Sequence, residues 1–246
     1  MSDRKTHTAI VTGAGKRVGA AIAAGLVSDG WAVVAHVHDP QDPVPDGAVR
    51  AVADLADENC ADAIFAALPG LPPPRLLVNN ASRFAWDSPG QWKSGEFDAH
   101  MAVNVRAPWA LIERFAACQD AQADSLAVNI LDSKVAAPNT DYLSYTISKQ
   151  ALAAATELAA RAFAERGVRV NGVAPALMIQ SPGQSEANFR TMHARNPLGR
   201  GVTPDDVVGA IRYLVDAPTV TGQVLVLDSG QRFMGLTRDV QFLEGE

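Results

Sequence analysis

The chain has 246 residues, 48% of them hydrophobic, and a formal net charge of −6. This charge argues against a nucleic-acid surface, which needs a basic patch, and no apolar run approaches the roughly 20 residues of a membrane span. Cys60 and Cys118 are the only cysteines and lack metal-ligand spacing. We therefore expect two buried thiols in a cytoplasmic protein, with no metal site.

Short apolar runs alternate with helical patterns along the chain. Runs typical of buried strands occupy residues 8–11, 31–37, 48–55, 75–78, 126–131, 168–173 and 223–227. Helical patterns occupy residues 17–28, 59–68, 96–118, 143–165 and 204–215. The prolines within 39–47 disfavour a helix there, and 175–203 is loop-like with a helical insert near 186–194. We expect the lid of a substrate site at about 176–203, because loops of this length are usually functional.

This alternation predicts one α/β domain over residues 1–246, with a Rossmann-like, doubly wound parallel sheet covered on both faces. Ligands of such sheets bind at the carboxyl ends of the strands. Several residues that can contact a ligand should meet at that edge: Gly13, His36–Asp39, Asp54, Asn80, Asp132 and Pro175.

The first strand is joined to the first helix by a glycine-rich stretch at residues 12–19. Gly13 permits a tight turn and Gly19 permits close packing of the helix on the strand. The free N–H groups at the start of the following helix can hold a pyrophosphate. The position of this loop directly after the first strand predicts a nucleotide site.

Tyr145 and Lys149 are four residues apart, so they share one face of the predicted helix. A free tyrosine titrates near pH ~10, and an ammonium within ~4–6 Å is expected to lower that pKa. Asp132 follows the strand that precedes this helix. Together the three residues are candidates for acid/base chemistry.

The glycine-rich loop, the run Asn79-Asn80-Ala81-Ser82, Asn104 and the Tyr145/Lys149 pair resemble the short-chain dehydrogenase/reductase family. The resemblance implies an oxidoreductase that transfers hydride with NADPH or NADH on a small-molecule substrate, assembled as a homotetramer. It implies the catalytic residues Asp132, Tyr145, Lys149 and Asn104, the last of which would hold a water in a proton relay. It implies the cofactor-binding residues Gly13, Arg17, Val18, Gly19, His36, His38, Asp54, Leu55, Asn80, Ala81, Ser82, Tyr145, Lys149 and Pro175.

Two departures narrow this resemblance. Arg17 stands where the family usually has a third glycine, and Asp132 where it usually has serine. With the aromatic Phe84 after Ala81 and Ser82, they are similar to the group of pteridine reductases and dihydromonapterin reductases. That likeness implies a pterin substrate, bound by Arg17, Ser82, Phe84, Asp132, Tyr145, Leu177 and Met178.

Three questions stay open from the sequence. A carboxylate at Asp39 favours NADH, whereas His36 and His38, if protonated, favour the extra phosphate of NADPH. Ser133 could replace the family serine after a one-residue slip, although successive strand residues face opposite ways. The alternatives to pterin reduction are a carbonyl or alcohol oxidoreductase on the same scaffold and a nucleotide sensor without catalysis.

Overall fold

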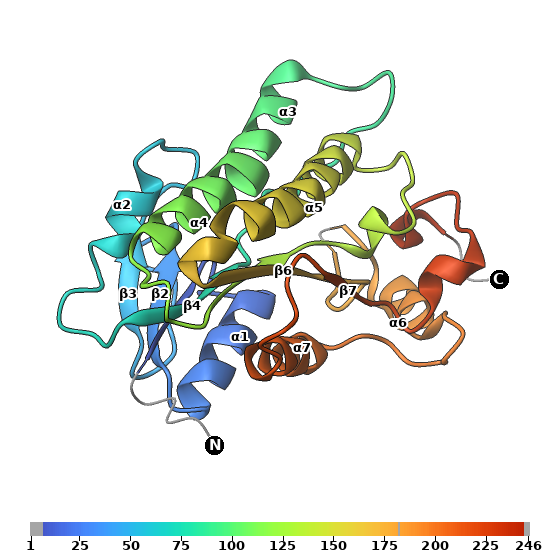
Figure 1. Ribbon diagram of the computed structural model, residues 1–246. Helices are drawn as coiled ribbons and strands as arrows, with labels where there is room; N and C mark the ends of the chain where they lie inside the picture. The colour runs from blue at the N-terminus through green and yellow to red at the C-terminus, as the bar shows by residue number, and fades with distance from the viewer. Residues whose placement is uncertain (1–6, 182, 244–246) are drawn as a thin grey trace.

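The computed structural model describes residues 7–181 and 183–243, which form one seven-stranded sheet in the order β3-β2-β1-β4-β5-β6-β7 (Figure 1). All its strand pairs are parallel. Because the strand order changes direction between β1 and β4, the sheet is doubly wound, as predicted. The strands are β1 (Thr8–Val11), β2 (Ala32–Val37), β3 (Val49–Val52), β4 (Pro74–Asn79), β5 (Ser125–Ile130), β6 (Val168–Pro175) and β7 (Val224–Leu227).

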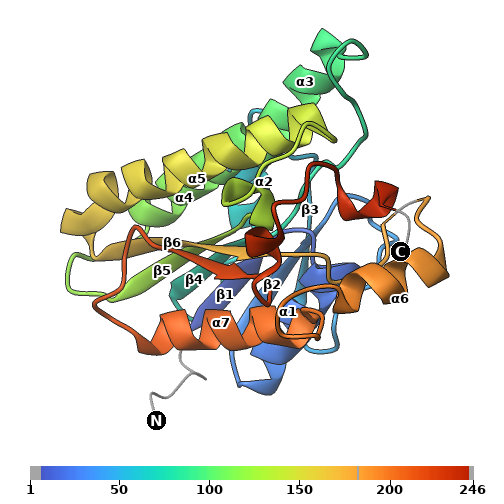
Figure 2. The ribbon, with the colours of Figure 1, turned by 90° about the vertical axis from the view of Figure 1, so that its right-hand side faces the viewer.

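Helices cover both faces of the sheet (Figure 2). The α-helices are α1 (Arg17–Ser28), α2 (Cys60–Phe65), α3 (Ser94–Met101), α4 (Ala107–Ala117), α5 (Leu143–Phe163), α6 (Glu186–Ala194) and α7 (Pro204–Asp216). Helices α1 and α7 pack on one face, where Ile22 and Ile211 are buried, and α2, α4 and α5 pack on the other. Full burial of each such side chain contributes about 1.5–3 kcal/mol.

The helix predicted over 96–118 is interrupted. A π-helical segment at Ala102–Arg106 separates α3 from α4, and the N–H of Ala107 donates to the carbonyl of Ala102. Pro108 has no N–H, so it cannot donate to the carbonyl of Asn104 four residues earlier. This missing donor explains the wider turn of the π-helical segment, which contains Asn104.

The predicted third strand, 48–55, is longer than β3. Among the residues that the structure describes, β3 lies at the edge of the sheet and pairs with β2 alone. It ends because the carboxylate of Asp54 accepts a hydrogen bond from the N–H of Ala56 at 2.8 Å, which turns the chain.

The prediction of two buried thiols is correct for Cys60 and wrong for Cys118, which is exposed. Cys118 caps the end of α4, and its sulfur lies 3.0 Å from a guanidinium nitrogen of Arg114 on the helix surface. Within the described residues, no helix is both long and apolar enough to cross a membrane.

The helical insert predicted at 186–194 matches α6. The sequence pattern predicts no helix or strand in the chain after β7. This segment contains two short 3-10 helices, at Gln231–Met234 and Val240–Phe242, and returns toward the start of α5 (Figure 2).

Candidate active site

One cavity of about 850 Å³ collects nearly all the predicted site residues. It runs along the carboxyl edge of the sheet, where the strand ends converge. Asn104 and Asp39 are the residues expected at the site that do not line it. The predicted residues that line the cavity are Gly13, Arg17, Val18, Gly19, His36, His38, Asp54, Leu55, Asn80, Ala81, Ser82, Phe84, Asp132, Tyr145, Lys149, Pro175, Leu177 and Met178.

The glycine-rich loop is tied to the end of β4. The Thr12 hydroxyl accepts hydrogen bonds from the N–H groups of Asn80 and Ala81, both at 3.0 Å. The Asn80 amide donates to the carbonyl of Thr12 at 2.9 Å. A Cβ on Gly13 would lie 2.9 Å from the Ala81 Cα, and the residue has φ +65°. The glycine-rich loop and the segment after β4 are therefore held rigidly together on one side of the cavity.

The start of α1 suits an anion. Its first turn carries no acidic residue, and its N-cap, Lys16, makes no side-chain capping hydrogen bond. The N–H groups of the first turn are thus left for a ligand, at the positive end of the helix. Both features fit a dinucleotide phosphate.

Gly19 allows α1 to approach β1 closely. We expect Gly19→Ala to destabilise the fold and to lower the affinity for NADPH at least about tenfold. A Cβ there would lie 2.0 Å from the Gly13 carbonyl oxygen. Gly209→Ala, at an exposed position of α7, meets nothing within 4 Å and should stabilise the protein by about 1 kcal/mol. Thermal unfolding and NADPH titration of both variants test this contrast; equal behaviour would contradict it.

Arg17 links the loop to the predicted lid. Its guanidinium donates to the carbonyl of Gln180, with nitrogen–oxygen distances of 3.2 and 3.3 Å. Arg17 has φ +54°, in the left-handed region, which is uncommon for a residue other than glycine. This conformation explains why the family's usual residue at this position is glycine, and it turns the Arg17 side chain toward the lid.

His36 is neutral in this structure, so it does not supply the positive charge that a protonated histidine would offer to the extra phosphate of NADPH. Its Nδ1 accepts from the Gly13 N–H at 3.2 Å, and its Nε2 therefore donates to the Ala53 carbonyl at 3.1 Å. Burial lowers the pKa of His36. His38, by contrast, is exposed, with its ring 3.9 Å from the Asp54 carboxylate.

The acidic residue that reaches the cavity beyond β2 is Asp42, which the sequence did not single out, and not Asp39. The Asp39 carboxylate accepts from the Gln41 N–H at 2.8 Å, and Asp39 does not line the cavity. Asp42 does line it, beside Gly15, with its carboxylate 3.8 Å from the Lys16 ammonium. Only the path of the loop decides which carboxylate faces inward.

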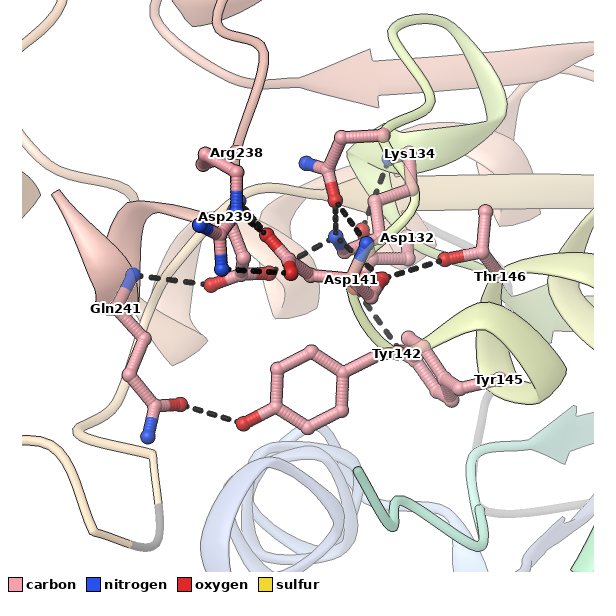
Figure 3. Close-up of polar contacts among 10 residues, drawn as sticks. Asp132, Lys134, Asp141, Tyr142, Tyr145, Thr146, Arg238, Asp239 and Gln241 are labelled. Atoms are coloured by element: carbon pink, nitrogen blue, oxygen red, sulfur yellow. Dashed lines mark hydrogen bonds and ion pairs between the residues drawn. The ribbon is translucent and has the colours of Figure 1, made fainter. Parts of the chain in front are cut away.

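Asp132 lies directly against Tyr145 (Figure 3). The Tyr145 hydroxyl donates to one carboxylate oxygen of Asp132 at 3.0 Å, and the Lys134 N–H donates to the other at 2.9 Å. Asp132, two residues after the end of β5, therefore occupies the position beside the phenol. Ser133 also lines the cavity, but no slip is needed to bring a side chain of this segment to Tyr145.

Burial governs the acidity of this pair. It raises the pKa of Asp132, and the Lys134 N–H, the Lys134 charge and the Tyr145 hydroxyl oppose that rise. Burial and the Asp132 charge raise the pKa of Tyr145 well above its usual value. The expected lowering by Lys149 is therefore wrong for this structure. Tyr145 remains a neutral phenol that can donate a proton.

Lys149 faces the cavity from the same side of α5 as Tyr145, as the four-residue spacing predicts. Its ammonium donates to the Ile130 carbonyl at 2.7 Å and lies 5.7 Å from the centre of the Tyr145 ring. Burial lowers the pKa of Lys149 to about 8. The amine therefore still carries its proton through most of the neutral range.

Phe84 forms an aromatic wall with two tyrosines. Its ring stacks on Tyr142 at 4.2 Å between centroids and meets the edge of Tyr145 at 4.8 Å. It is 38% exposed, so part of the ring remains open to the cavity. A flat ligand would find a preformed apolar surface here.

Asn104 is buried and holds the segment that carries Phe84. Its side-chain oxygen accepts from the Arg83 N–H at 2.7 Å, and its nitrogen donates to the Arg83 carbonyl at 3.0 Å and to Ser148 at 2.9 Å. Its side chain therefore braces the cavity wall from behind. The water relay predicted for Asn104 stays a prediction.

Sequence reasoning missed a group of charged residues beside the cavity. Lys134, which the sequence did not single out, is 7% exposed and lies two residues after Asp132. Its ion-pair partner, Asp239, comes from the C-terminal part of the chain (Figure 3). No spacing in the sequence connects Lys134 with Asp239, because the two residues are far apart in the chain and meet only through the segment that follows β7.

Comparison with known proteins identifies the family. Residues 13–232 match the family described as Enoyl-(Acyl carrier protein) reductase. The chain is 31% identical to 3beta-hydroxysteroid dehydrogenase 1 of Eggerthella lenta, covering 99% of both chains. It is 26% identical to a dihydromonapterin reductase of Klebsiella pneumoniae subsp. pneumoniae, over 94% of this chain and 99% of that one.

Among solved structures, the FolM alternative dihydrofolate reductase 1 of Brucella suis, in complex with NADP, is similar with a TM-score of 0.87. The identity is 32%, over 94% of this chain and 96% of that chain. The protein therefore belongs to the short-chain dehydrogenase/reductase family. It is an oxidoreductase that works with NADPH or NADH, and its relatives include dihydromonapterin and pteridine reductases.

Proposed function

We propose that the protein reduces a dihydropterin-type substrate with NADPH, and that Tyr145 is the proton donor. One observation carries the substrate class: a half-buried carboxylate, Asp132, lies 3.0 Å from the Tyr145 hydroxyl. An ionised carboxylate there accepts hydrogen bonds and repels a developing oxyanion, so it suits the amino and imino nitrogens of a pterin better than a ketone oxygen.

The cofactor fits the residues at the other end of the cavity. The open first turn of α1 would hold the pyrophosphate, and glycines at 13 and 19 leave room that a side chain would fill. Asp54 would bond the adenine amino group, Lys149 the nicotinamide ribose, and the Pro175 region the carboxamide. When bound, the reduced nicotinamide supplies a hydride to the electrophilic carbon of a substrate C=N bond.

The remaining chemistry falls to the residues of this chain. Tyr145 donates its hydroxyl proton to the substrate nitrogen as hydride reaches the carbon, so the C=N bond becomes CH–NH. The Lys149 ammonium, 5.7 Å from the phenol ring, stabilises the phenolate that remains. Asp132, whose pKa burial raises, can accept an N–H of the substrate or pass a proton back to Tyr145.

Phe84 would hold the flat ring, and Arg17 would bridge the ring and the cofactor phosphate. Leu177 and Met178 would close the apolar side of the site as part of the lid. The open part of the Phe84 ring and the place of Arg17 in the cavity lining support these positions. The homotetramer and the cytoplasmic location expected from the sequence remain proposals.

The second candidate is a carbonyl or alcohol oxidoreductase. The apolar lid wall suits it as well as it suits a pterin, and one relative is named for 3beta-hydroxysteroid dehydrogenation. Turnover of dihydromonapterin and dihydrobiopterin, compared with 3-oxosteroids and simple ketones at equal NADPH, separates the two. A catalytic efficiency on ketones that exceeds that on every dihydropterin would reject the first proposal.

The cofactor preference gives a further prediction. Asp42→Asn should raise the ratio of kcat/KM for NADPH to that for NADH, by up to about tenfold. A carboxylate ~4 Å from the 2′-phosphate opposes it by ~4 kcal/mol at an effective dielectric of ~20, before screening. Asp39→Asn is the matched control and should leave the ratio unchanged, because Asp39 does not line the cavity. The opposite pattern would restore Asp39 as the selector.

A further inference from the structure

The chain after β7, residues 228–243, is here named the C-terminal strap. It contributes six residues to the cavity lining: Gln231, Arg232, Leu236, Arg238, Asp239 and Val240. Within the described residues, the hydrophobic core clusters include no member of the strap, and Phe233 on it is 73% exposed. Polar contacts and the stacking of Phe242 on Tyr142, with ring centroids 6.1 Å apart, therefore hold the strap over the cavity. Segments that bury little apolar surface open at low cost.

Those contacts converge on the segment that leads into α5 (Figure 3). The Asp141 carboxylate accepts two hydrogen bonds from the Arg238 guanidinium, at 2.7 and 3.0 Å, and one from the Asp239 N–H at 2.8 Å. Next to it, the Tyr142 hydroxyl donates to the Gln241 side chain at 2.6 Å. Tyr142 is also the residue on which Phe84 stacks, so the strap is fastened behind the aromatic wall.

Lys134 connects the strap to the catalytic pair. Its ammonium lies 2.9 Å from the Asp239 carboxylate, and both side chains are largely buried. The same ammonium donates to the Asn139 side chain at 2.7 Å. Its backbone N–H holds Asp132, whose other oxygen accepts from Tyr145. One residue thus contacts the strap at one end and the proposed acid at the other.

We propose that Lys134 is a positioning residue, which orients Asp132 against Tyr145 when Asp239 of the C-terminal strap holds its ammonium. The strap then does two things at once: it covers the substrate end of the cavity and it fixes the short helix Ser133–Val135 that presents the Lys134 N–H. This inference rests on the proposed reductase function for its kinetic readout, but not for its structural one.

The test uses Lys134→Met, Asp239→Asn and the double variant. Lys134→Met removes the ammonium and keeps the N–H, while Asp239→Asn removes the charge at constant shape. Each single variant should lower kcat/KM for the reducible substrate about tenfold, with KM for NADPH changed less than about twofold. The double variant should also lose about tenfold, because both changes break one connection.

A second readout needs no substrate. Trypsin cleavage after Arg238 in the NADPH-loaded protein, followed by mass spectrometry, reports opening of the strap. We expect faster cleavage in all three variants and no change in Asp29→Asn, which breaks the ion pair with Arg212 on the far side of the molecule. If dihydropterins fail as substrates for the wild type, the pterin proposal fails, and the strap is still tested by cleavage and by the substrate that is turned over.

Variants that melt at lower temperature but keep wild-type kcat/KM would reduce Lys134 to a structural residue and overturn the inference. A hundredfold loss in the double variant, about the product of the single losses, would also overturn it, since independent residues act additively in free energy. Unchanged cleavage after Arg238 would show that Asp239 does not hold the strap.

Discussion

Tyr145→Phe is expected to lower kcat about 10³-fold, within the range that a single positioned proton donor supplies. Tyr145 lines the cavity, and its hydroxyl donates a hydrogen bond to Asp132. The raised pKa of Tyr145 keeps this hydroxyl protonated at neutral pH. Phenylalanine keeps the ring that meets Phe84 and removes only the hydroxyl group, which carries the proton. Stopped-flow measurement of NADPH oxidation gives the rate.

The chain offers a matched control in Tyr213→Phe. Tyr213 lies on α7, is 55% exposed and is remote from the cavity, so the same loss of a hydroxyl should leave kcat within about twofold. NADPH should still bind Tyr145→Phe with nearly wild-type affinity, and a small fall in Tm is expected because Asp132 loses a donor. If Tyr145→Phe kept more than about a tenth of the activity, another group would have to be the proton donor.

Asp132→Ser should lower dihydropterin reduction about 10²-fold and leave ketone reduction unchanged or faster. The carboxylate accepts hydrogen bonds from nitrogen-bound protons, which serine cannot replace with a charged partner. A serine hydroxyl can instead donate to a carbonyl oxygen, which the ionised carboxylate cannot do. The test is the ratio of steady-state kcat/KM for a dihydropterin to that for one ketone, measured on the same preparation of each variant. This ratio should fall in Asp132→Ser relative to the wild type.

Ser133→Ala controls for the neighbouring hydroxyl. Ser133 lines the cavity, yet Asp132 makes the contact with Tyr145, so Ser133→Ala should change both activities less than about threefold. A large loss in Ser133→Ala with little effect of Asp132→Ser would reverse the two roles. Unimpaired pterin turnover in Asp132→Ser would falsify the pterin assignment, which rests on this carboxylate.

Both predictions depend on residues that the sequence could identify because their spacing is local. Tyr145 and Lys149 lie one turn apart on α5, and Gly13 and Gly19 flank the entry to α1. Local spacing places such residues on one face whatever the rest of the chain does. The alternation of apolar strands and helices likewise predicted the doubly wound sheet, and its carboxyl edge then predicted which residues would meet.

The predictions that were wrong have physical causes that helix and strand patterns in the sequence do not show. Pro108 changes the helix after Asn104 by removing one donor, and the effect depends on how the turn relaxes. The acidity of Tyr145 was predicted from the Lys149 charge alone. In the folded protein, burial outweighs that charge and raises the pKa instead.

The fold class, the nucleotide loop and the Tyr145/Lys149 pair are therefore predictable from the sequence, because each depends on periodicity or on neighbours within one turn. The tertiary structure decided which carboxylate faces the cavity, Asp42 or Asp39, and it brought Asp239 to Lys134 from across the chain. These choices depend on the paths of loops and of the C-terminal strap. Such paths follow from packing against distant elements, which no local pattern encodes.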